Sequence, residues 1–242
     1  MKRRVIACSG AVGVIVVLFL GLAYFGVCTL NRPSRAQYPV RGVDVSSYQG
    51  QIDWPILASQ GIEFAFIKAT EGSGHVDPRF AQNWAAASQT DLRIGAYHFF
   101  SYDSPGSTQA QNFIQTVAPV DGMLPPVVDV EFYGDKEQNL PEPAAVQTEL
   151  TVLLESWEQA YGLKPILYAT EKSYRLYLAG HFDDYDIWIR DVVWTPTLED
   201  QRTWTFWQYS NRGRLGGYHG DETYIDLNVF AGTQQAFTDY GR

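Results

Sequence analysis

Apolar and polar positions follow two different spacings along residues 40–180. Short runs rich in β-branched and aromatic residues have the composition of strands, and the stretches between them repeat apolar residues at helical spacing. Asp53 and Asp77 stand where a helix would begin, and Gly162 stands where one would end. The predicted strands cover residues 42–45, 64–69, 93–100, 127–132 and 165–169, and the predicted helices cover residues 54–60, 78–88, 107–117, 143–161 and 172–178.

The order of these elements predicts the fold class. Strand and helix alternate five times, which favours parallel strands joined by right-handed helical crossovers, in an α/β sheet or a closed barrel. After residue 185 three further strand-like runs, at residues 186–189, 203–209 and 223–229, have only turns between them, such as the glycine-rich stretch 212–220. Eight strands with helices after the first five predict one incomplete barrel, formed by residues 37–242 as a single domain.

The first 36 residues differ in character from the rest of the chain. Residues 5–30 carry no charge and would form a helix roughly 39 Å long, which exceeds the roughly 30 Å hydrocarbon core of a bilayer. Three basic residues precede this run, so we expect a cytoplasmic N-terminus, a transmembrane anchor at about residues 5–30, a linker to residue 36 and a domain outside the cytoplasm. The alternative is a signal peptide cleaved near Ser34-Arg35-Ala36, which would give a secreted or periplasmic protein.

Cysteine content and charge exclude several kinds of site and of binding partner for the predicted domain. Both cysteines, Cys8 and Cys28, lie in the apolar run, so residues 37–242 can form neither a disulfide nor a cysteine metal site. Five of the 18 basic residues and none of the 27 acidic ones lie in residues 1–36, which leaves the predicted domain with a net charge of −14. Such a domain would repel nucleic acid phosphates, so nucleic acid is not an expected partner.

Four acidic residues stand at or near predicted strand ends. Asp129 and Glu131 lie two residues apart, and on a strand both side chains would point to the same face. Two like charges so close raise at least one pKa, as a general acid near neutral pH requires, although a solvated strand end would carry the same spacing. Asp44 and Asp226 lie in the first and last predicted strands. Parallel barrels gather their chemistry at the carboxyl ends of strands, so we expect these four acids to meet in one cleft.

Eight short blocks occur in order along the chain: RGVDVSSYQG at 41–50, IDW at 52–54, FIKATEG at 66–72, IGAYHF at 94–99, DVE at 129–131, ILY at 166–168, WQY at 207–209 and IDLN at 225–228. Taken together, they closely resemble the glycoside hydrolase family 25 lysozymes. The resemblance implies a modified TIM-like barrel with eight strands and about five helices, in which the last strands lack crossover helices. It also implies an N-acetylmuramidase that hydrolyses the β-1,4 bond between N-acetylmuramic acid and N-acetylglucosamine in peptidoglycan.

By matching position, the resemblance gives Glu131 the role of general acid and makes Asp129 its partner carboxylate. Asp44 and Asp226 complete the acidic cluster. Two questions stay open at this point. One is which aspartate stabilises the oxocarbenium ion, and the other is whether the acetamide of the substrate acts as the nucleophile instead. The separation of the carboxyl groups distinguishes a retaining from an inverting enzyme.

Aromatic residues near other strand ends are candidates for sugar binding, because flat rings stack on pyranose C–H surfaces. Core packing is the competing interpretation for each of them. One residue departs from the pattern of the family: Arg190 follows Ile187-Trp188-Ile189, where a small residue is expected. Arg190 could contact a site acid or a peptide-stem carboxylate, or lie on the surface. The four candidate sugar-binding residues are Tyr97, Tyr168, Trp188 and Trp207.

The sequence predicts no metal and no cofactor, since the four histidines are scattered without metal-ligand spacing. We expect a monomeric glycosidase whose partners are peptidoglycan glycan strands and, through the N-terminal helix, a membrane. Two other functions use the same residues. One is hydrolysis of another N-acetylated glycan such as chitin, and the other is a non-catalytic module that binds the cell wall.

Overall fold

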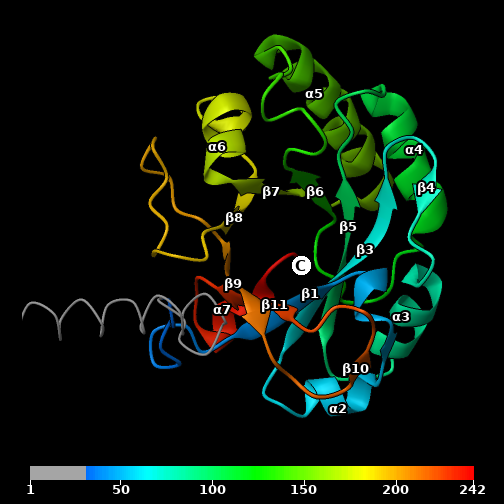
Figure 1. Cartoon of the computed structure of the whole chain (residues 1–242), viewed down its shortest axis with the longest axis vertical. Coiled ribbons are helices and arrows are strands. Elements are labelled where there is room, and N and C mark those ends of the chain that lie inside the picture. The colour runs from blue at the N-terminus through cyan, green and yellow to red at the C-terminus, as the bar shows by residue number, and fades with distance from the viewer. Residues whose placement is uncertain (1–30) are drawn as a thin grey trace, which may run out of the picture.

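The computed structural model describes residues 31–242, which form a closed barrel of eight strands (Figure 1). The strands follow one another around the barrel in the order β1, β11, β9, β8, β7, β6, β5 and β3, and pairing of β1 with β3 closes it. Their bounds are Arg41–Val45 for β1, Phe64–Glu71 for β3, Arg93–Phe99 for β5, Val127–Val130 for β6, Ile166–Thr170 for β7, Asp186–Arg190 for β8, Phe206–Gly213 for β9 and Ile225–Phe230 for β11. All eight predicted strands are therefore present, and the predicted barrel is confirmed.

The direction of one strand was not predicted from the sequence. Every neighbouring pair in the barrel is parallel except the two that involve β11, which runs antiparallel to both β9 and β1. Only residues 214–224 connect β9 to β11, and a short connection of this kind joins antiparallel strands. Outside the barrel, β4 (His75–Val76) extends the edge of β3, and β2 (Gln51–Ile52) pairs with β10 (Tyr218–His219).

The five predicted helical regions are all helical. Asp53 accepts a hydrogen bond from the backbone N–H of Ile56 and so caps α2, and Gly162 ends α5 in the left-handed conformation at φ 67°. The predicted helices correspond to α2 (Trp54–Ala58), α3 (Phe80–Ala87), α4 (Gly106–Thr116), α5 (Pro143–Tyr161) and α6 (Glu171–Ser173), and the π-helical turn η2 (Tyr174–Leu178) continues α6. A 3-10 turn, η1 (Ser47–Gln49), follows β1, and a further helix, α7 (Gln234–Asp239), was not predicted by the sequence pattern.

Helices cover the barrel unevenly. Figure 1 shows α3, α4 and α5 along one side, outside β3, β5 and β6. Residues 191–205, which connect β8 to β9, contain no helix, in agreement with the predicted lack of crossover helices at the end of the chain. Helix α7 packs its Phe237 against Phe64 and Phe230 in the barrel interior, with ring centroids 5.5 and 5.2 Å apart. This contact fills the barrel below the carboxyl ends of the parallel strands.

The beginning of the described chain rests on the barrel. Asn31 is buried, and its side-chain amide donates hydrogen bonds to the carbonyl oxygens of Asp191 and Trp194 at 3.3 and 2.8 Å. Arg41 donates to the carbonyl of Pro33 at 2.5 Å. Within residues 31–242 no helix is both long and apolar enough to cross a membrane. The predicted anchor at residues 5–30 lies outside the described residues.

Candidate active site

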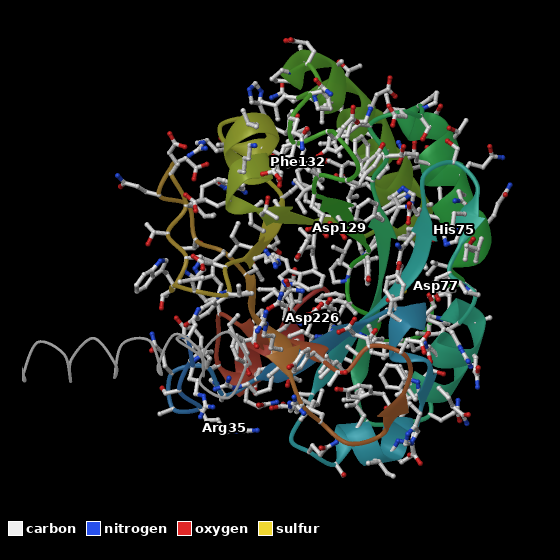
Figure 2. All side chains as sticks on the ribbon, in the orientation of Figure 1. Arg35, His75, Asp77, Asp129, Phe132 and Asp226 are labelled. Atoms are coloured by element: carbon white, nitrogen blue, oxygen red, sulfur yellow. The ribbon has the colours of Figure 1, made fainter. Side chains whose placement is uncertain are left out.

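The four predicted acids line one cleft of about 510 Å³ at the carboxyl ends of the parallel strands. Asp44 lies in β1 and pairs in register with Asp226 of β11, while Asp129 lies in β6 and Glu131 follows the last residue of that strand. In Figure 2, Asp129 and Asp226 come from different strands and lie around the same central opening. The strand β6 is two residues shorter than predicted, yet both of its acids face the cleft. The structure therefore brings together the side chains at 44, 129, 131 and 226.

Two side-chain amides hold Asp44 in place. Gln208 donates from Nε2 to both carboxylate oxygens of Asp44, at 3.2 and 3.0 Å, and Asn228 donates from Nδ2 to Oδ2 at 2.7 Å. Each amide is oriented in turn by an aromatic residue. The hydroxyl of Tyr168 donates to Oε1 of Gln208, and the indole N–H of Trp188 donates to Oδ1 of Asn228, both at 2.9 Å. All five side chains are buried, so their positions are fixed before any ligand arrives.

The carboxyl groups of Asp226 and Asp44 are in contact, and the hydrogen bond between them requires a proton on one of them. Burial raises the pKa of Asp226 well above its usual range, and the negative charge of Asp44 raises it further. Burial also raises the pKa of Asp44, while hydrogen bonds from Asn228, Gln208 and Asp226 lower it in part. A protonated Asp226 can therefore donate a hydrogen bond to an ionised Asp44, which accepts from three groups.

Asp129 and Glu131 form the second acidic pair. Burial raises the pKa of Asp129 well above its usual range, and the charge of Glu131 adds to this effect. Asp129 is only 6% exposed, and its Oδ1 has no hydrogen-bond partner among residues 31–242. Burial likewise raises the pKa of Glu131, which is partly exposed to the cleft. The pair therefore keeps a proton at a higher pH than a free carboxyl group, and Glu131 is the member that can reach a bound molecule.

Three of the four predicted sugar-binding aromatics line the cleft. Tyr97 is partly exposed there, whereas Tyr168 and Trp188 are almost fully buried and present only small areas. Their polar atoms are already engaged with Gln208 and Asn228. These contacts give Tyr168 and Trp188 a structural role that the sequence did not indicate.

Trp207 lies elsewhere. Its ring packs against Tyr38 and Trp204 outside the barrel, and its indole N–H donates to the carbonyl of Asp191 at 2.8 Å. Strand alternation explains this, because in β9 the inward positions are Phe206 and Gln208. The same alternation, applied to the sequence, would have selected Gln208 as a cleft residue.

Two cations enter the acidic cleft. Lys68 forms an ion pair with Glu71 at 2.8 Å. Arg190, the last residue of β8, lines the cleft, and its charge lowers the pKa of Asp44, Glu131 and Asp226. Of the alternatives left open for Arg190, the structure excludes a purely surface position. Tyr48, which is 71% exposed, also borders the cleft.

Comparison with known proteins identifies the family of this chain. The family model described as Glycosyl hydrolases family 25 matches residues 43–218. A solved family 25 glycosyl hydrolase from Bacillus anthracis is 53% identical, with a TM-score of 0.83 over 88% of this chain and 98% of that chain. Lysozyme M1 of Streptomyces globisporus is 33% identical over 211 residues, which are 80% of this chain and 68% of that protein. The uncharacterized protein YegX of Escherichia coli strain K12 is 38% identical over 212 residues, 84% of this chain and 75% of that protein. The chain therefore belongs to glycosyl hydrolase family 25 and is a glycosidase.

Proposed function

We propose that this glycosidase is a lysozyme that hydrolyses the β-1,4 bond between N-acetylmuramic acid and N-acetylglucosamine in peptidoglycan. The observation that carries the proposal is the convergence of four acids, with raised pKa values, in one cleft at the carboxyl ends of the barrel strands. The relative named Lysozyme M1 supports the same class of substrate.

In the proposed reaction Glu131 is the general acid and gives its proton to the glycosidic oxygen. Its partial exposure allows contact with the substrate, whereas Asp129 is too deeply buried to reach a leaving group. While the single proton of the pair is on Glu131, Asp129 is ionised and carries a negative charge deep in the cleft. Asp44, held by Gln208 and Asn228, provides a second negative charge across the cleft. Both negative charges stabilise the positive charge that develops on the sugar ring in the transition state.

Sugar binding in this proposal uses the aromatic side chains that border the cleft. Tyr97 offers a partly exposed ring, and Tyr168 and Trp188 form the floor. Trp207 has no part in it, because its ring packs outside the barrel.

The function is tested by incubating purified peptidoglycan with the wild type and with Glu131→Gln. The amide cannot donate a proton, so release of soluble fragments should fall by about 100-fold or more. Glu155→Gln, on the exposed side of α5, is the matched control and should keep wild-type activity. Fragment release by Glu131→Gln at a comparable rate would reject the assignment. Binding to peptidoglycan by the wild type without any release would support the non-catalytic alternative instead.

The proposed substrate places the catalytic domain outside the cytoplasm, because peptidoglycan lies there. The apolar run at residues 5–30 supports either a membrane anchor or an export signal. Mass spectrometry of the mature protein separates them, since only a signal peptide is removed. We further propose that the enzyme works as a monomer, because one chain supplies all four acids of the cleft.

A further inference from the structure

The acidic cleft continues into a second hollow of about 630 Å³. Glu131 and Arg190 line both spaces, so they stand at the junction between them. The second hollow is bordered by Lys172 and Arg175 on one side and by Trp194, which is 71% exposed, on the other. A polymer that fills the cleft past Glu131 therefore passes Arg190.

Arg190 is held rigidly, but its charge is unpaired. Its backbone lies in register with Thr170 on one side and Gln208 on the other. The guanidinium is partly exposed and forms no ion pair or hydrogen bond with any residue in the described part of the chain.

Two lysines and one carboxylate close to Arg190 have partners of their own. Lys68 is paired with Glu71, and Lys172 is paired with Glu137 at 3.3 Å. The adjacent carboxylate, Asp191, accepts from the backbone N–H groups of Val193 and Trp194 at 2.9 and 2.8 Å. Arg190 is therefore a donor group on a fixed strand end that is available to a ligand in either hollow.

The surrounding charge limits what Arg190 can bind. An anionic substituent that entered the acidic cleft would be repelled by the acids at 44, 129 and 131. Of the two cations that line this cleft in the described part of the chain, Lys68 is paired with Glu71, so the guanidinium of Arg190 offers the favourable site. Guanidinium groups bind carboxylates through paired hydrogen bonds. In the proposed substrate the two sugars differ in this respect, because muramic acid bears a lactyl group that ends in a carboxylate or in a peptide with carboxylates. N-acetylglucosamine is neutral.

We propose that Arg190 binds a carboxylate of the lactyl or peptide substituent of muramic acid. It thereby selects the cell-wall glycan over neutral N-acetylglucosamine polymers and fixes which sugar lies beside Glu131. This inference rests on the proposed function, and it adds the feature by which the enzyme recognises its substrate. It also accounts for an arginine at a position where the sequence pattern of the family led us to expect a small residue.

The test compares two soluble tetrasaccharides of alternating N-acetylglucosamine and N-acetylmuramic acid, one with lactyl carboxylates and one with the same groups converted to primary amides. The measured quantity is the ratio of kcat/KM for the carboxylate substrate to kcat/KM for the amide substrate. Because Glu131 serves both substrates, a change in its pKa leaves this ratio unaltered.

We expect Arg190→Gln to lower the ratio by about tenfold to 100-fold, mainly through KM, as loss of a charge-assisted hydrogen bond implies. Arg190→Lys should fall between Arg190→Gln and wild type. Arg79→Gln, at a position that lines neither hollow, is the control and should keep the wild-type ratio.

An unchanged ratio in Arg190→Gln would overturn the proposal, as would a wild type that cleaves both substrates with equal kcat/KM. A binding measurement separates this result from failure of the proposed function. In the Glu131→Gln background, the carboxylate tetrasaccharide should bind at least tenfold more weakly when Arg190→Gln is added. If the wild type cleaves neither tetrasaccharide but this difference in affinity persists, the proposed hydrolysis fails while the role of Arg190 stands. Equal affinities of the Glu131→Gln variant and of the double variant that also carries Arg190→Gln would contradict the role of Arg190 directly.

Discussion

The side-chain amide of Asn228 donates a 2.7 Å hydrogen bond to Oδ2 of Asp44, joining two residues 184 positions apart in the chain. Both side chains are buried, and Asn228 is itself oriented by the indole N–H of Trp188. The antiparallel pairing of β11 with β1 makes this contact possible, because it places the last strand of the barrel beside the first. One wall of the cleft is thus assembled by the closure of the barrel.

We predict that Asn228→Ala lowers both stability and activity. Removing the amide leaves Asp44 with one donor fewer and Trp188 with an unpaired N–H, which should cost about 1–3 kcal/mol of the free energy of unfolding. Because the pKa of Asp44 should rise further without this donor, kcat/KM should fall by about tenfold or more. Urea denaturation and a peptidoglycan assay measure the two effects. Asn139→Ala, at an exposed site, is the control, and equal behaviour of both variants would contradict the role of Asn228.

Two tryptophan variants distinguish a residue that supports the cleft, Trp188, from a residue that packs outside the barrel, Trp207. Trp188→Phe and Trp207→Phe each remove one indole hydrogen bond from a buried ring, so both should destabilise the fold by roughly 1–2 kcal/mol. Only Trp188 holds a side chain that contacts Asp44. Activity at a temperature well below unfolding should therefore fall in Trp188→Phe and stay close to wild type in Trp207→Phe. Loss of activity in Trp207→Phe alone would show that the cleft has been placed on the wrong side of the barrel.

Asp129→Asn should abolish activity and stabilise the protein at neutral pH. Burial raises the pKa of Asp129 in the folded state, so the folded protein binds this proton more tightly than the unfolded chain does. The associated stability is fully present below the unfolded value, about pH 4, and is lost as pH rises toward the raised value. The neutral amide escapes that loss, so the variant should gain on the order of 1–2 kcal/mol at pH 7 relative to pH 4. Urea denaturation at pH 4 and at pH 7 measures the difference in the free energy of unfolding between the variant and the wild type. A difference that favours the variant less at pH 7 than at pH 4 would contradict the prediction.

His98 should make the free energy of unfolding depend on pH in the opposite direction. Burial between Thr70 and Gln109 lowers the pKa of His98 to about 4. The unfolded chain therefore binds the proton first, and the stability present above about pH 6.5 is lost as pH falls toward 4. The loss should reach about 3 kcal/mol, and it should be absent from His98→Asn. His181→Asn, at an exposed histidine, is the control and should retain the pH dependence of the wild type.

Local signals in the sequence were sufficient to place most of the fold. Residues 143–161 were predicted as a helix and form α5 with those bounds, because Pro143 fits the first turn and Gly162 ends the last. The four acids could be found because each lies at or near a strand end among apolar neighbours. Helix α7 was missed, since its six residues are too few to show a periodic pattern.

The remaining features depend on contacts between distant parts of the chain. Alternation of apolar residues predicts a strand but not its direction, so the antiparallel course of β11 was not foreseen. Gln208 and Asn228 approach Asp44 from 164 and 184 residues away, and no local pattern marks an amide as the partner of a buried carboxylate. Trp207 was chosen for its ring, although the period of two in β9 places Gln208 in the cleft.

The most direct test of the account is to identify the new reducing ends that the full-length protein creates in purified peptidoglycan. Products are reduced with borohydride and analysed by mass spectrometry. A lysozyme that uses the cleft around Glu131 should yield ends on muramic acid only, and these ends should disappear with Glu131→Gln. New ends on N-acetylglucosamine, or muramic acid ends that persist in Glu131→Gln, would contradict the account.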